Sequence, residues 1–173
     1  MNGPLADVFR YNRWANLALL DACAALTTEQ LDARVPGTTR TIRELLVHLV
    51  GGQQNFIQRT QGRQHEGVLS AWPGLAALRD IAASTSEELI RIAEATETSP
   101  DVDLPYRGKT YRYPVSFFLT QALAHGAEHR AEITMTLATL GVAHPDLDGW
   151  FYAAAMGYGS EVGKVSRPSS ATP

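Results

Sequence analysis

The strongest constraint on the fold is the helical spacing of apolar residues in four long segments. In residues 5–26, 42–57, 75–93 and 117–140, apolar residues recur at intervals of three and four, which places them on one side of a helix. Thr41 and Glu44 also form a capping-box pattern at the start of the second segment. Helices of this kind must bury their apolar faces against one another. We therefore expect an all-α fold, a four-helix bundle.

Shorter elements are expected between and after the long helices. Residues 104–115 are rich in tyrosine and contain Arg107-Gly108 at their middle, which predicts a short hairpin or an extended crossover. Ser116 is the expected N-cap of the fourth long helix, which should close at Gly141. Asp148 should open a short C-terminal helix. We expect residues 1–165 to form one domain and the polar, proline-rich residues 166–173 to be a disordered tail.

Composition excludes several classes of protein. The chain has 173 residues, of which 45% are hydrophobic, so it can bury a core without disulfides. Its net charge of -3 and scattered basic residues argue against a nucleic-acid partner. No stretch approaches the ~20 apolar residues of a membrane span, and no secretion signal is evident, so a soluble cytoplasmic protein is expected. The single cysteine, Cys23, lies among alanines and is interpreted as a core residue rather than a reactive thiol.

Three histidines occupy or border the apolar faces of the expected helices. His125 and His129 are four residues apart, so both side chains leave one face of a helix, and His48 lies beside the apolar stripe of the second helix. Gly51-Gly52 leaves room there for a second helix to approach. One histidine on an apolar face is usually a hydrogen-bonded core residue, but three together favour a divalent metal site. Three nitrogen ligands suit zinc or nickel and leave open coordination positions.

The remaining two histidines are expected at the surface. His65 lies in a polar connection, and His144 precedes a proline in a loop.

Sequence motifs give the chain a family resemblance. The sequence YNRWAN at residues 11–16, His48 and the sequence HGAEHRAEI from residue 125 resemble the DinB/YfiT-like family of metalloenzymes, over nearly the whole chain. The resemblance implies a four-helix bundle with a crossover connection, often a homodimer. It also implies one metal ligand on the second long helix and two on the fourth, at positions that match His48, His125 and His129.

The chain departs from the family pattern at two positions. Members commonly have a second histidine where this chain has Glu128, and a glutamine where it has Glu132. Either glutamate can accept the free ring N–H of a ligand histidine or act as a catalytic base. The alternative is a solvated helix face on which the glutamates pair with Arg130.

Aromatic and amide residues of the first helix also match the family. Tyr11, Trp14 and Asn16 are candidates to line a pocket over the metal, although a tryptophan at such a position is more often part of the core.

Related families with this bundle include transferases and isomerases that use a low-molecular-weight thiol such as bacillithiol or mycothiol. The leading hypothesis is therefore a metal-dependent transferase that activates such a thiol for attack on a small electrophilic substrate. A metal-dependent hydrolase using activated water is the second hypothesis, and a non-catalytic metal-binding stress-response protein is the third. For the homodimer, the candidate contacts are the aromatic residues Trp150, Phe151 and Tyr152.

Overall fold

The described part of the chain is a bundle of four long helices with two short helices and one hairpin. The computed structural model describes residues 3–63, 66–96 and 98–159. The elements in chain order are α1 (Pro4–Cys23), α2 (Thr28–Leu31), α3 (Ile42–Thr60), α4 (Leu75–Ala95), β1 (Asp101–Tyr106), β2 (Lys109–Pro114), α5 (Val115–Thr139) and α6 (Gly149–Ala155). The predicted tail, residues 166–173, lies outside the described residues.

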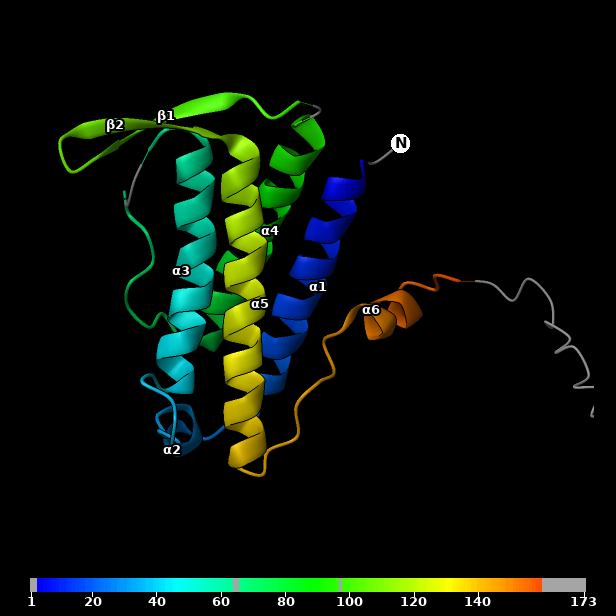
Figure 1. Cartoon of the computed structure of the whole chain (residues 1–173). Helices are drawn as coiled ribbons and strands as arrows, with labels where there is room; N and C mark the ends of the chain where they lie inside the picture. Colours follow the sequence, from blue (N-terminus) through cyan, green and yellow to red (C-terminus); the bar gives the residue numbers. More distant parts are fainter. Residues whose placement is uncertain (1–2, 64–65, 97, 160–173) are drawn as a thin grey trace, which may run out of the picture.

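The long helices pack in two antiparallel pairs, α1 with α4 and α3 with α5 (Figure 1). Helices α3 and α4 run in the same direction, so the connection between them returns along the side of α3 before α4 begins (Figure 1). This confirms the four-helix bundle and its crossover. The hairpin β1–β2 lies across one end of the bundle, and α6 packs on α1.

Local hydrogen bonds explain where several helices begin. The Thr41 side chain accepts a hydrogen bond from the Glu44 backbone N–H, and the Glu44 carboxylate accepts one from the Thr41 N–H, so the predicted capping box is present. Asp148 caps α6 in a similar way through two backbone N–H groups. A second capping box, Thr27 with Gln30, starts α2. Sequence periodicity missed this helix because its four residues are too short to repeat a pattern.

The predicted hairpin forms with Arg107-Gly108 as its two-residue turn. The strands are antiparallel, and Tyr106 pairs with Lys109 next to the turn. Arg107 and Gly108 both have positive φ, 48° and 74°, as the tightest hairpin turns require.

The predicted cap of α5 is wrong by two residues. Pro114 occupies the N-cap position and α5 begins at Val115. The Ser116 backbone N–H donates to Ser99 Oγ, and the Val115 N–H donates to the Pro100 carbonyl. The residues just before β1 thus supply the acceptors for the first backbone N–H groups of α5.

The core consists of two apolar clusters, one toward each end of the bundle. Between them, each long helix contributes buried polar residues: Asn12 and Asn16 from α1, Gln53 from α3, Thr85 and Ser86 from α4, and His129 and Arg130 from α5. Within this layer Gln53 hydrogen bonds to Ser86 at 3.1 Å and to Thr85 at 3.0 Å. The three candidate histidines lie at the same level of the bundle.

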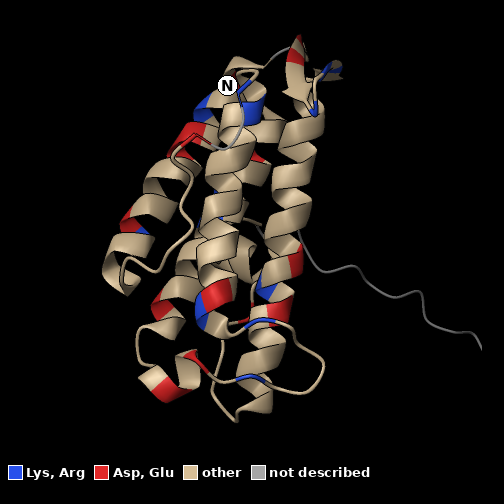
Figure 2. Ribbon diagram, turned by 90° about the vertical axis from the view of Figure 1, so that its left-hand side faces the viewer, with Lys and Arg blue, Asp and Glu red and all other residues tan. Residues whose placement is uncertain are grey.

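The single cysteine lies in the core, as expected. Cys23 is fully buried, and burial raises the pKa of its thiol to about 12, as fits a core cysteine. Charged residues of both signs are scattered along the bundle without a basic stripe in the view of Figure 2. None of the helices in the described part of the chain is long and apolar enough to cross a membrane.

Candidate metal centre

Neighbouring helices bring the three histidines together. His48 comes from α3, while His125 and His129 come from successive turns of α5, the antiparallel partner of α3. One ring nitrogen from each histidine lies within 4.8 Å of the other two. Nε2 of His48 and Nε2 of His125 are 3.3 Å apart. The sequence could place His125 beside His129 but could not place His48 against them.

This geometry fits a shared metal ion. Two nitrogens bound to one ion at about 2.1 Å lie about 3.0–3.4 Å apart when the bond angle is tetrahedral or somewhat smaller. The separation of His48 and His125 falls in this range. The three nitrogens lie within 4.8 Å of one another, so at least one imidazole must move closer for all three to bind one ion at this bond length. A separation of 3.3 Å also suits a hydrogen bond between two neutral imidazoles. A metal ion is therefore inferred from the third histidine and from the surroundings of the site.

A glycine on α3 makes room for the His125 ring. A Cβ atom at Gly52 would lie 2.2 Å from His125 Cε1, far inside van der Waals contact. Phe56, one turn further along α3, contacts the same ring edge-on with centroids 5.5 Å apart. The close approach predicted at Gly51-Gly52 is therefore made at Gly52 by the His125 ring of α5. At Gly51 the neighbour is the backbone of the crossover, because a Cβ there would lie 2.5 Å from the Leu69 carbonyl oxygen.

Replacing Gly52 with alanine should weaken metal binding by at least about 100-fold without unfolding the protein. The new methyl group displaces the end of the His125 side chain, while alanine favours a helix interior by roughly 0.5–1 kcal/mol over glycine. Zinc titration of the metal-free variant in a calorimeter, with urea unfolding alongside, measures both effects.

Gly126→Ala is the matched control, because its Cβ would meet Asn12 and Arg130 rather than a histidine. Unchanged zinc affinity in Gly52→Ala would show that the His125 ring takes no part in binding.

The surroundings of His48 and His125 favour the neutral form of their imidazoles, which is the form that binds metals. Burial lowers the pKa of His125 from 6.5 to about 4, and the nearby charges of His129, His48 and Arg40 act in the same direction. Loss of hydration, followed by the charge of Arg40, also lowers the pKa of His48. Exposure increases from the buried His129 through His125 to the exposed His48, so the centre opens toward solvent on one side.

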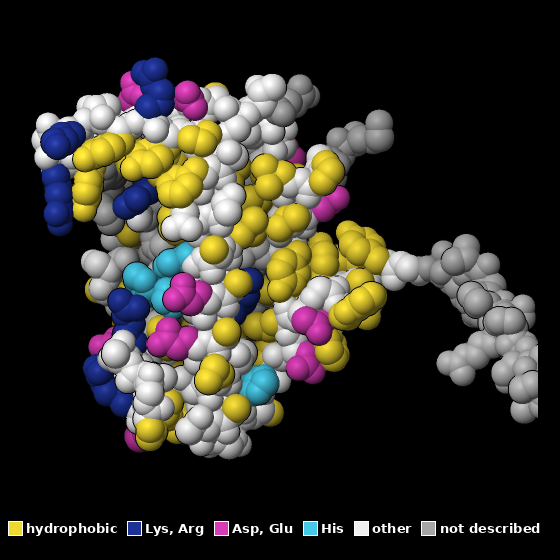
Figure 3. Space-filling model, viewed as in Figure 1, with side chains coloured by type: hydrophobic (Ala, Val, Ile, Leu, Met, Phe, Trp, Pro, Cys, Tyr) yellow, Lys and Arg dark blue, Asp and Glu magenta, His cyan; other side chains and the backbone are white. Residues whose placement is uncertain are grey.

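Two surface hollows meet at His48. One, of about 560 Å³, is bordered by His125, Gly52 and Phe56, and the other, of about 510 Å³, is bordered by Arg40 and Trp72. Both also contact Leu69 and Ser70 of the crossover. Figure 3 shows the histidine side chains at the surface of this face, with basic side chains beside them. A small molecule can therefore reach His48 and His125 from outside.

Comparison with known proteins identifies the family. The family model described as DinB family matches residues 1–161. The chain belongs to the DinB family. A DinB-like protein from Bacillus cereus, known from a crystal structure, is similar, with a TM-score of 0.61 and 20% sequence identity over 82% of this chain and 94% of that one. At this identity the similarity supports the fold alone. A search of curated proteins gave no match.

The two glutamates of this DinB protein differ in their surroundings. Glu132 is half-buried, and its carboxylate accepts a hydrogen bond from His129 Nδ1 at 3.2 Å. This contact leaves Nε2 of His129 free for an ion. Glu128 is exposed and has no hydrogen bond or ion pair with any described residue.

The alternative interpretation, in which Arg130 pairs with these glutamates, is wrong. Arg130 is 5% exposed and points toward α1, where its Nη1 donates to the side-chain oxygens of Asn12 and Asn16, each at 2.7 Å. Arg130 also lies over the ring of Tyr11. In this DinB chain, His129 thus points from α5 toward the histidine cluster with α3, whereas Arg130 points toward α1.

Tyr11 and Trp14 lie in an aromatic cluster with Tyr152 of α6. The Tyr11 hydroxyl donates to the Leu147 carbonyl at 2.7 Å. Both residues border hollows other than the two that reach the histidines. Asn16 is buried and accepts from Arg130, so it too lies apart from the histidine hollows.

The remaining histidines and the C-terminal aromatic residues agree only in part with their predicted exposure. His144 is exposed, as predicted, while His65 lies outside the described residues. Among the aromatic residues proposed for a homodimer, Trp150 and Phe151 are 85% and 51% exposed, but Tyr152 is buried. Sequence reasoning missed Arg40 and the crossover residues Leu69 and Ser70, because no helical pattern links them to the histidines.

Proposed function

We propose that this protein binds one divalent ion, zinc or nickel, through His48, His125 and His129 and acts as a metal-dependent transferase. The substrate pair would be a low-molecular-weight thiol and a small electrophile. The observation that carries the proposal is the cluster of three ring nitrogens, in which His48 and His125 border hollows, with no fourth metal-ligating side chain grouped with it among the described residues. Such a site leaves positions for exogenous ligands.

Each residue of the centre would have a defined task. A bound divalent ion lowers the pKa of a coordinated thiol or water and so supplies a nucleophile at neutral pH. The chain's own contribution is to hold three imidazoles close together, to orient His129 through Glu132 and to admit small molecules along the crossover. We include a homodimer, with Trp150 and Phe151 at its interface, in the proposal; a monomeric mass in solution would overturn that part.

Metal content and thiol dependence test this function. Untagged protein should contain about one divalent ion per chain by elemental analysis. The loaded protein should then consume a small electrophile such as an epoxide only when a thiol is present. Turnover of esters or amides without thiol would support the metal-dependent hydrolase instead. A metal-free protein that cannot be reloaded would contradict both.

Replacing Glu132 with alanine should lower zinc affinity by about 10- to 100-fold, because His129 loses the acceptor that fixes its ring and tautomer. Competition with a chromogenic chelator measures the change. Glu132→Gln retains an oxygen acceptor and should recover much of the affinity, whereas Glu128→Ala, on the exposed side of the same helix, should have no effect. Equal losses in the alanine and glutamine variants would show that charge rather than ring orientation matters.

A further inference from the structure

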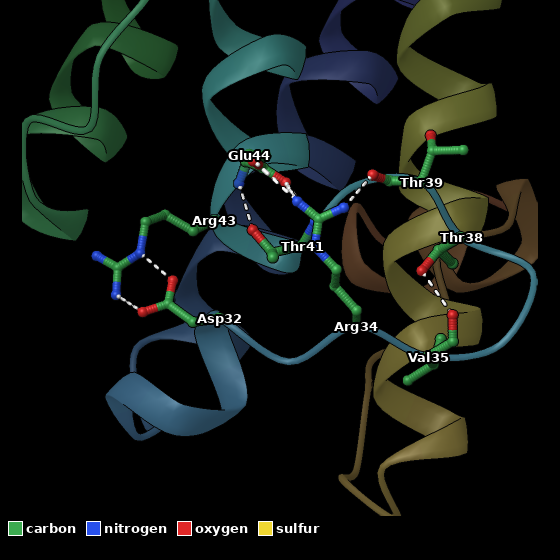
Figure 4. Close-up of polar contacts among 8 residues, drawn as sticks. All are labelled: Asp32, Arg34, Val35, Thr38, Thr39, Thr41, Arg43 and Glu44. Carbon is green, nitrogen blue, oxygen red and sulfur yellow. Dashed lines mark hydrogen bonds and ion pairs between the residues drawn. The ribbon is translucent and has the colours of Figure 1, made fainter.

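The loop that leads into α3 is held by paired charges. Arg34 donates to the Thr39 carbonyl at 2.7 Å and forms an ion pair with Glu44 at 3.3 Å. Arg43 makes two hydrogen bonds to Asp32, at 2.5 and 2.9 Å. Figure 4 shows these contacts on both sides of the first turn of α3. The loop therefore has a defined course between α2 and α3.

Arg40 is the exception in this loop. Its guanidinium has no ion pair or hydrogen bond with any residue that the structure describes, although Arg34 and Arg43 both have carboxylate partners. Arg40 borders the 510 Å³ hollow together with Arg43, Glu44 and His48. Asp32 pairs with Arg43 and Glu44 with Arg34, and Glu44 also feels the charge of Arg40, so these five groups together leave one net positive charge beside the hollow.

The charge of Arg40 reaches the histidine centre. It is among the causes that lower the pKa of both His48 and His125. A guanidinium presents a planar pair of N–H donors that matches a carboxylate, and such charge-assisted bonds are stronger than neutral ones. The unpaired guanidinium and the imidazole of His48 thus border one hollow and offer binding groups for the two ends of a small molecule.

We propose that Arg40 binds the carboxylate of a small anionic thiol whose sulfur is directed to the three histidines. This rests on the proposed function and narrows it, because the thiol would be selected by its negative charge. Arg43 borders the same hollow but is engaged by Asp32 and stacked over Trp72, so it would not take this role. The neutral part of the thiol would lie against Leu69 and Trp72.

The test uses the full chain loaded with Co²⁺, whose absorption reports thiolate binding directly. Elemental analysis first establishes that the metal is bound in the wild type and in each variant. The protein is then titrated with 3-mercaptopropionate and with its neutral amide, and with 6-mercaptohexanoate and its amide, so that a carboxylate at either reach can be detected. Wild-type protein should bind at least one of the two acids about tenfold more tightly than its amide.

Arg40→Gln should remove this preference while the metal content and the affinity for the amides stay the same. Arg43→Gln is the matched control, since it removes a charge that Asp32 already compensates, and it should keep the preference. Equal affinity of the wild type for acids and amides, or a preference that persists in Arg40→Gln, would overturn the role of Arg40 while leaving metal binding intact. A chain that takes up no metal would overturn this inference together with the proposed function.

Discussion

His129→Ala should reduce the metal content from about one divalent ion per chain to nearly none. His129 is the most buried of the three histidines, and two remaining imidazoles leave too few protein ligands to hold zinc or nickel firmly. Elemental analysis after dialysis measures the loss directly. Circular dichroism should show an unchanged helix content, because both apolar clusters of the core are untouched.

The matched control is His144→Ala, which removes an exposed histidine of the loop after α5. It should keep the full metal content and so exclude binding at His144. His48→Ala should lose the metal like His129→Ala, because His48 is the ligand that α3 contributes to the cluster. Full metal content in a folded His129→Ala protein would leave three packed core histidines and remove the basis for the proposed chemistry.

Arg130→Ala should destabilise the protein by about 3 kcal/mol. The substitution leaves the buried oxygens of Asn12 and Asn16 without their donor, at about 1–3 kcal/mol for an unsatisfied group, and adds a cavity. Urea unfolding followed by circular dichroism gives the change in the free energy of unfolding. Zinc affinity per folded chain should change little, because Arg130 faces α1 whereas the metal ligands face α3.

Two substitutions test the cause of this loss. Arg130→Met fills much of the same volume and should cost less, since burial of a cation without a carboxylate partner is itself unfavourable. Arg91→Ala removes an exposed arginine of α4 and should change stability by less than about 0.5 kcal/mol. A loss below about 1 kcal/mol in Arg130→Ala would mean that water replaces the guanidinium at the two asparagines.

Local chemistry in the sequence was enough to predict most of the elements. The repeat of apolar residues located the four long helices, because residues three and four apart lie on the same face of any helix, whatever packs against it. Thr41 with Glu44, Asp148 and Arg107-Gly108 each act on backbone groups within a few residues, so their effects could be inferred without the fold. The pairing of His125 with His129 follows from the same local geometry.

The tertiary structure decided what those elements meet. Ser116 is not a cap, because α5 begins one residue earlier, at Val115. The backbone N–H groups of Val115 and Ser116 donate to Pro100 and Ser99, which precede the hairpin. Arg130 turns to α1 rather than to the glutamates on its own helix, and Tyr11 and Trp14 turn to α6 rather than to the histidines.

His48 and Arg40 belong to the same lesson. The sequence alone determined that three histidines lie on or beside helical faces. That α3 places His48 within 3.3 Å of His125, with the unpaired Arg40 bordering the same hollow, depended on the packing of α3 against α5. Such contacts arise from the shapes of all four helices together, and spacing along one helix carries no information about the register of its neighbour.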